Sequence, residues 1–270
     1  MRKIFVSVIV PASNSEKTIE KCIHSLLNQN YPKGRYEIMI VDNGSTDDTV
    51  ELVRKYGKKI ILLHNPVKNS YEARNTGIMK ARGSILAFTD SDCVAHPSWL
   101  RALARRFENS EVKIVGGSIA AASKKNSLQK YCDKFCHAQE IFYMKRAFAT
   151  SNMGLRSSKG KILFDTGLSL GADFELCSRI VKSPREIIYE PRAMVYHQYS
   201  NSLWEFLKKH FLYGRSNGII LRKHKKRFFD LGFKWPGILK RHGPVFAILK
   251  IMQDISFGSG VIFGYIIGKA

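Results

Sequence analysis

Residues 4–14 read Ile-Phe-Val-Ser-Val-Ile-Val-Pro-Ala-Ser-Asn, an almost unbroken apolar and β-branched run that ends at proline and then at polar side chains. Such a run is typical of a strand that is covered on both faces, as in a parallel sheet. A helix is expected next, because apolar residues recur at helical spacing between positions 19 and 27, with Ser15 as the candidate N-cap.

The same unit of strand and helix repeats along the first part of the chain. We expect further strands at 38–41, 60–63 and 85–89 and a helix at 71–81. Strands that alternate with helices at this spacing form βαβ units, so we predict an α/β fold with a mostly parallel, Rossmann-like sheet that helices flank. Sheets of this kind bind ligands beyond the carboxyl ends of their strands.

Polar side chains stand at three of these predicted strand ends. Residues 11–14 follow the first strand, Asp42 ends the second, and Asp90-Ser91-Asp92 follows the strand at 85–89. We therefore expect them to line one crevice. Two carboxylates separated by one residue can hold a divalent cation, Mn²⁺ or Mg²⁺, while leaving coordination sites open for phosphate oxygens. A polar turn that caps a helix is the alternative.

Two further residues are candidates for the same ligand. Asp42 can accept a hydrogen bond from a nucleobase, and its alternative role is an Asx turn or a helix cap. Arg74, on the predicted helix at 71–81, can pair with a phosphate or with one of the strand-end acids. A solvated surface arginine is the alternative for that residue.

Four blocks of sequence resemble the family 2 glycosyltransferases of GT-A fold, and their order and spacing agree with that family. The blocks are Ser-Val-Ile-Val-Pro-Ala-Ser-Asn (7–14), Ile-Val-Asp-Asn-Gly-Ser-Thr-Asp (40–47), Ala-Arg-Asn-x-Gly (73–77) and Phe-Thr-Asp-Ser-Asp (88–92). The resemblance is strong over the first third of the chain and looser to about residue 215. It implies a metal-assisted, inverting transfer of a sugar from a nucleotide-sugar donor to an acceptor hydroxyl of a glycan or lipid-linked glycan.

The resemblance also implies roles for single residues. The donor site would consist of Pro11, Ala12, Asn14, Asp42, Arg74, Asp90, Ser91 and Asp92. Within it, residues 11–14 and Asp42 would contact the base and ribose. Arg74 would lie at the diphosphate, Asp90 at the ribose and Asp92 at the metal.

Two more family positions lie in the second half of the chain. Gly171-Ala172-Asp173 resembles a Gly-Glu-Asp block, which implies that Asp173 is the general base. Such a base takes the proton of the acceptor hydroxyl as its oxygen attacks the anomeric carbon opposite the leaving diphosphate. The alternative for Asp173 is a helix cap. His197 matches a histidine near the metal, so we expect it as a metal ligand, with a structural histidine as the alternative.

Two positions depart from the family pattern. Ala172 replaces the glutamate, which weakens the expected contacts to the acceptor, and Ser13 replaces an aromatic residue that stacks on the base. These departures leave open a protein that binds sugar nucleotides without catalysis. They also leave the identity of the base open.

We expect three parts along the chain: a nucleotide-sugar-binding half of the catalytic domain at 1–92, an acceptor-binding half at 93–200, and a basic and apolar helical segment at 201–270. Residues 245–267 are long enough to cross a bilayer, but two charges interrupt them. A single crossing, a pair of shorter helices in the interface and a buried hairpin are therefore the alternatives.

Glycines recur every fourth residue at 260, 264 and 268, which lets a helix approach another closely. The stretch from 208 to 241 is rich in lysine and arginine, so we expect it to face anionic lipid. We therefore predict a membrane-associated enzyme on the cytoplasmic face of the cell membrane.

Charge and cysteine usage narrow the class of protein. The formal net charge of +22 favours anionic partners: nucleoside diphosphates, phospholipid headgroups or nucleic acid. No recognisable nucleic-acid module accompanies the charge, so a nucleic-acid binder is only the alternative from another class. Five cysteines without metal spacing favour a reducing cytosol.

A transferase that acts on a polyprenyl phosphate is the alternative among enzymes, and its acceptor oxygen needs little help from a base.

Overall fold

The computed structural model describes residues 4–135, 146–168, 170–224 and 240–266. The strands are β1 (Val6–Ala12), β2 (Tyr36–Asp42), β3 (Ile61–His64), β4 (Ile85–Thr89), β5 (Cys93–Ala95), β6 (Ile114–Ala121), β7 (Asn152–Arg156) and β8 (Ile187–His197). The helices are α1 (Ile19–Leu27), α2 (Thr49–Arg54), α3 (Ser70–Lys80), α4 (Trp99–Arg106), α5 (Ser127–Phe135), α7 (Ala172–Ile180), α8 (Leu203–His224) and α10 (Pro244–Ile266).

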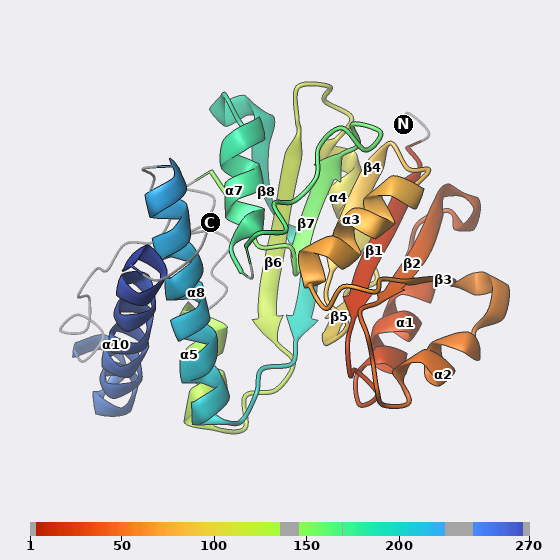
Figure 1. Ribbon diagram of the computed structural model, residues 1–270. Coiled ribbons are helices and arrows are strands. Elements are labelled where there is room, and N and C mark those ends of the chain that lie inside the picture. Colours follow the sequence, from red (N-terminus) through yellow and green to blue (C-terminus); the bar gives the residue numbers. More distant parts are fainter. Residues whose placement is uncertain (1–3, 136–145, 169, 225–239, 267–270) are drawn as a thin grey trace.

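The strands form one sheet in the order β3-β2-β1-β4-β7-β6-β8-β5 (Figure 1). The first four strands in this order are parallel, as the alternating pattern predicts. β7 runs antiparallel to both β4 and β6, whereas β6 and β8 are parallel and β5 is antiparallel to β8. The α/β fold is therefore confirmed, with a parallel first half in a sheet that is mixed as a whole.

β1 is the centre of the parallel half, and every one of its residues is buried. Its side chains alternate between two hydrophobic layers. Val8 and Val10 pack with residues of α1 and α4, whereas Ile9 packs on the opposite face with residues of α3 and α7. This two-sided burial explains why the sequence of β1 is apolar almost throughout.

The observed bounds differ from the predicted ones by small shifts, except at the start of α1. That helix begins at Ile19 with Thr18 at its N-cap position, so the prediction that Ser15 is the cap is wrong. The Ser15 hydroxyl instead lies 2.8 Å from the Ser91 hydroxyl. This contact joins the loop after β1 to the loop after β4.

α8 and α10 lie side by side at the end of the sheet where α7 is found (Figure 1). The Ser256 hydroxyl donates to the carbonyl of Leu207, and a Cβ on Gly260 would lie 2.1 Å from the carbonyl oxygen of Phe211. One turn further along both helices, a Cβ on Gly264 would lie 2.0 Å from the carbonyl oxygen of Arg215. The contacts advance together along both helices, so the two helices pack in parallel, backbone against backbone.

α10 is one continuous helix, so of the three alternatives the pair of shorter helices is wrong. Lys250 and Asp254, whose charges prompted that alternative, form an ion pair one turn apart. Within the described part of the chain, α10 is also the one helix that is long and apolar enough to cross a membrane. Gly268, the third glycine of the predicted packing series, lies outside the described residues.

Replacing Gly260 with alanine tests the close packing of these helices. Alanine is the better helix residue by about 1 kcal/mol, so any loss of stability must come from the clash with the Phe211 carbonyl. We expect Gly260→Ala to lose about 1–3 kcal/mol, as overpacked sites do, measured by thermal unfolding. Gly34→Ala is the matched control, because nothing lies within 4 Å of its added Cβ. Equal unfolding midpoints for the two variants would contradict the packing.

Candidate active site

Two cavities open at the carboxyl ends of the parallel strands. The smaller has a volume of about 270 Å³ and the larger about 970 Å³. Most of the predicted site residues line the smaller cavity: Pro11, Ala12, Arg74, Asp90, Ser91, Asp92, Asp173 and His197. Asn14 lines the larger cavity, where Ser91, Asp92 and His197 recur. Residues that are far apart in the sequence therefore meet at one edge of the sheet, as expected.

Arg74 is buried in the wall of the smaller cavity, at 4% exposure, so it is not the solvated arginine of the alternative interpretation. It forms an ion pair with Asp90 and donates a 3.1 Å hydrogen bond to the carbonyl of Ser70. Its Nε has no hydrogen-bond partner among the described residues. A buried guanidinium with a spare donor is suited to an anionic ligand.

Asp42 lies in the lining of neither cavity and is 3% exposed. Its Oδ1 accepts a 3.1 Å hydrogen bond from the backbone N–H of Ser45, and its Oδ2 lies 3.0 Å from Nδ1 of His64. The first contact fixes the loop after β2, and the second joins that loop to the end of β3. The neighbouring Asn43, which the sequence did not single out, lines the smaller cavity instead.

Asn14 positions a loop as well as lining the larger cavity. Its backbone is in the left-handed region, with φ at 49°, and its side-chain Oδ1 accepts a 2.8 Å hydrogen bond from the backbone N–H of Thr46. Asparagine tolerates this conformation better than most residues. The loops after β1 and β2 are thereby joined beside the larger cavity.

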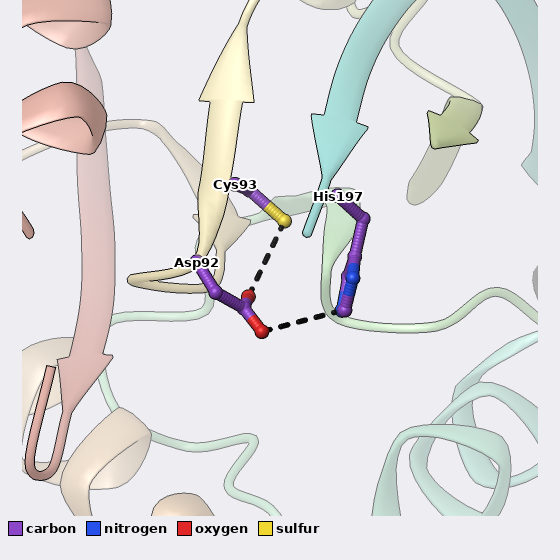
Figure 2. A group of neighbouring side chains, drawn as sticks. All are labelled: Asp92, Cys93 and His197. Atoms are coloured by element: carbon purple, nitrogen blue, oxygen red, sulfur yellow. Dashed lines mark hydrogen bonds and ion pairs between the residues drawn. The ribbon is translucent and has the colours of Figure 1, made fainter. Parts of the chain in front are cut away.

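Asp92, Cys93 and His197 form the group that can hold a metal ion (Figure 2). Strand pairing sets Cys93 opposite His197, and Asp92 Oδ2 lies 3.6 Å from His197 Nε2. Burial lowers the pKa of His197 although Asp92 raises it, so the imidazole is the neutral form that a metal requires. Burial raises the pKa of Cys93 far above its ordinary value, and its thiol is therefore a poor ligand. A carboxylate and an imidazole are donors that suit Mn²⁺.

Asp173 is the second residue of α7, and Gly171 occupies the N-cap position with φ at 82°. The Asp173 carboxylate bonds to its own helix and to other segments: Oδ1 accepts from the N–H of Phe174 at 3.0 Å and from the Tyr71 hydroxyl at 3.3 Å, and Oδ2 accepts from the N–H of Thr150 at 3.1 Å. Burial raises the pKa of Asp173, whereas the Thr150 hydrogen bond and the Arg74 charge lower it. A buried carboxylate with a raised pKa beside an open cavity is suited to accept a proton.

Besides Asn43, the sequence analysis missed Tyr71, Lys209 and Tyr213. Tyr71 holds Asp173, and Lys209 and Tyr213 line both cavities from successive turns of α8. Lys209 is one of many cations in a basic stretch, so nothing in the sequence distinguishes it from its neighbours. The C-terminal segment, which we expected only at a membrane, therefore also contributes to this site.

The sequence profile of glycosyl transferase family 2 matches residues 7–180. The chain belongs to this family. Glycosyltransferase AglE of Haloferax volcanii is 32% identical over 221 residues, which are 78% of this chain and 72% of that protein. The dolichyl N-acetyl-alpha-D-glucosaminyl phosphate 3-beta-D-2,3-diacetamido-2,3-dideoxy-beta-D-glucuronosyltransferase of Methanococcus voltae is 28% identical over 282 residues, which are 97% of this chain and 84% of that protein.

Solved structures agree with the GT-A fold of this glycosyltransferase. The mannosyltransferase PcManGT from Pyrobaculum calidifontis, in complex with GDP-Man and Mn²⁺, superposes with a TM-score of 0.71 at 16% identity and covers 98% of this chain and 88% of its own. S. aureus TarS 1–349 in complex with UDP-GlcNAc gives a TM-score of 0.62 at 19% identity, with coverages of 96% and 82%. The predicted family and fold are therefore confirmed.

Substituting Asp92 tests the candidate metal site. Asp92→Asn keeps the size of the side chain but loses its charge, so we expect Mn²⁺ affinity to fall at least about tenfold. A loss of about tenfold is the smallest that is usual when even a residue that only hydrogen-bonds a metal ligand is replaced. Titration calorimetry with Mn²⁺ and a nucleoside diphosphate measures it. Asp48→Asn, an exposed acid outside both cavities, is the control. Unchanged Mn²⁺ affinity in Asp92→Asn would rule out its role as a ligand.

Proposed function

We propose that this glycosyltransferase transfers a sugar, with inversion, from a nucleoside-diphosphate sugar to a hydroxyl of a lipid-linked glycan at the cytoplasmic face of a membrane. The observation that carries the proposal is the composition of the smaller cavity, where the buried carboxylate of Asp173 lines the same space as Arg74 and the Asp90-Ser91-Asp92 run. A base and a set of diphosphate-binding groups in one cavity are what a single displacement needs.

The donor is bound, in this proposal, by the first half of the chain. Pro11, Ala12 and Asn14 contact the base and ribose, and Asp90 and Ser91 lie beside the ribose. Asp42 acts indirectly, by holding the loop after β2. Arg74 and Lys209 hold the diphosphate with their positive charges. Asp92 and His197 would hold the divalent cation, and its charge would offset the negative charge that develops on the leaving diphosphate.

The acceptor is bound by residues 93–200 and reaches Asp173. Its hydroxyl oxygen forms a bond to the anomeric carbon of the sugar, the bond from that carbon to the diphosphate oxygen breaks, and the hydroxyl proton moves to the Asp173 carboxylate. Tyr71 and the backbone of Thr150 hold this carboxylate in place. Attack from the side opposite the diphosphate inverts the anomeric centre.

A lipid-linked acceptor on the cytoplasmic side is supported by three observations. The Methanococcus voltae relative is named for transfer to a dolichyl-phosphate-linked sugar. α10 offers a long apolar surface, and a basic stretch precedes it. Cys22, Cys93 and Cys177 are buried free thiols, which fits a reducing compartment.

Asp173→Asn tests the general base. The substitution keeps the size of the side chain and loses its proton-accepting charge, so we expect the transfer rate to fall by about 10²–10⁴-fold. The affinity for a nucleoside diphosphate should barely change. A screen of UDP-, GDP- and dTDP-sugars with Mn²⁺ first identifies the donor, and radiolabelled transfer then measures the rate.

Glu175→Gln is the matched control for Asp173→Asn. Glu175 lies on the same turn of α7 and pairs with Arg179 outside the cavities, so its loss should leave the rate nearly unchanged. Transfer at the wild-type rate by Asp173→Asn would instead favour a polyprenyl phosphate acceptor, whose oxygen ionises without a base. A collapse of donor binding would place the carboxylate in the donor site.

Lys209→Met tests the contribution of α8 to donor binding. A charge-assisted contact to phosphate contributes about 1.5–3 kcal/mol, so its loss should weaken nucleoside diphosphate binding by about tenfold or more. Lys208→Met is the matched control, because Lys208 is the exposed neighbour that lines neither cavity. Equal dissociation constants for the two variants, measured by calorimetry, would remove Lys209 from the site.

A further inference from the structure

One face of α10 is apolar and open to the surroundings. Most of the exposed large hydrophobic residues among those that the structure describes lie on this one helix: Val245, Ile248, Ile251, Ile255, Ile262, Phe263, Tyr265 and Ile266. Ile255 and Ile262 are 65% and 63% exposed. Many of these residues follow one another at intervals of three or four, so they form a stripe along the helix, which we call the outer face of α10.

The opposite face of α10 is held against the protein. Its glycines at 260 and 264 touch the backbone of α8, and Gly214 and Gly218 of α8 touch the backbone of α10 in return. The charged side chains of α10 and Gln253 also face inward: the Lys250–Asp254 ion pair is mostly buried, and Gln253 accepts a hydrogen bond from the Tyr131 hydroxyl of α5. Leu249 and Phe257 are buried as well. Ser259 is the exposed polar exception, and its hydroxyl donates to the carbonyl of Ile255 within the helix. α10 thus presents a mainly apolar surface away from the protein.

This packing restricts how α10 can meet a membrane. The two helices run in parallel, so α10 cannot cross a bilayer as α8 is now placed unless α8 enters the hydrocarbon with it. α8 carries Glu205, Lys208, Arg215 and Arg222 along its length, and each charge at membrane depth is costly. α8 also holds Lys209 at both site cavities, which open toward water-soluble donors.

We propose that α10 lies in the plane of the membrane interface, with its outer face in the lipid and its glycine face on α8, and does not span the bilayer. The occupant of the outer face is an anionic lipid surface, because the exposed cations Lys240 and Arg241 stand directly before α10 and the chain carries a net charge of +22. This inference deepens the membrane part of the proposed function and rests on it.

Vesicle binding tests the outer face. Purified full-length protein should cosediment with vesicles of phosphatidylglycerol and phosphatidylcholine, and less so with phosphatidylcholine alone. Ile255→Glu combined with Ile262→Glu should lower the partition coefficient at least about tenfold, because each substitution removes apolar surface from the lipid contact and puts a negative charge in its place. Met79→Glu is the matched control, since Met79 is an apolar side chain of α3 that is 62% exposed.

Three outcomes of this experiment are informative. Loss of vesicle binding in the double variant alone, with circular dichroism and nucleoside diphosphate binding intact, supports the proposal. Equal binding by the double variant and by Met79→Glu overturns it. A wild-type protein that is dimeric in size-exclusion chromatography, with a monomeric double variant that still binds vesicles, shows that a second copy covers the outer face and also overturns it.

Topology distinguishes lying in the interface from crossing it. Full-length protein with epitope tags at both ends should show both tags on one side of the membrane, measured by protease protection in intact spheroplasts and in inverted vesicles. Tags on opposite sides would overturn the proposal. Asp173→Asn should bind vesicles as the wild type does, so a failure of the catalytic proposal and a failure of the membrane proposal give different results.

Discussion

The parallel pairing of β1 with β2 and with β4 is the constraint on which the site depends. Because the three strands run in the same direction, their carboxyl ends meet at one edge, and the loops after β1 and β4 lie close enough for Ser15 and Ser91 to touch. Burial of β1 on both faces makes its position rigid. Loops on a rigid sheet edge can hold charged groups at the fixed separations that a diphosphate requires.

The sequence predicted the parts of the fold that a local pattern encodes. The apolar runs of β1, β2 and β4 and the acids that follow β4 were sufficient for a parallel sheet with a polar edge. The antiparallel direction of β7 was not predictable from a local pattern. It arises because β7 pairs with β4 on one side and with β6 on the other, and both strands are distant from β7 in the sequence. The start of α1 was misplaced because Ser15 has the residue type of a cap but bonds elsewhere.

Most of the residues that the sequence predicted for the site line the smaller cavity, whether they lie at a strand end or on a helix. Arg74, Asp90, Asp92, Asp173 and His197 all line the smaller cavity, whereas Asp42, also at a strand end, turns its carboxylate to its own loop and to His64. Lys209 was not predictable as a cavity-lining residue, because its position depends on where α8 packs relative to the sheet. The sequence has 44 lysines and arginines, and no local pattern distinguishes the few that line a cavity.

α8 contributes to the candidate site and to the packing of α10. Its residues Lys209 and Tyr213 line the smaller cavity, and its backbone packs against the glycines of α10. Binding of a donor to the cavity and seating of α10 on α8 therefore act on the same rigid element. By thermodynamic reciprocity, whatever free energy the donor adds to the seating of α10, the seated α10 adds equally to the affinity for the donor. In the proposed function, donor affinity and the seating of α10 are therefore linked: where one changes through this contact, the other changes by the same free energy.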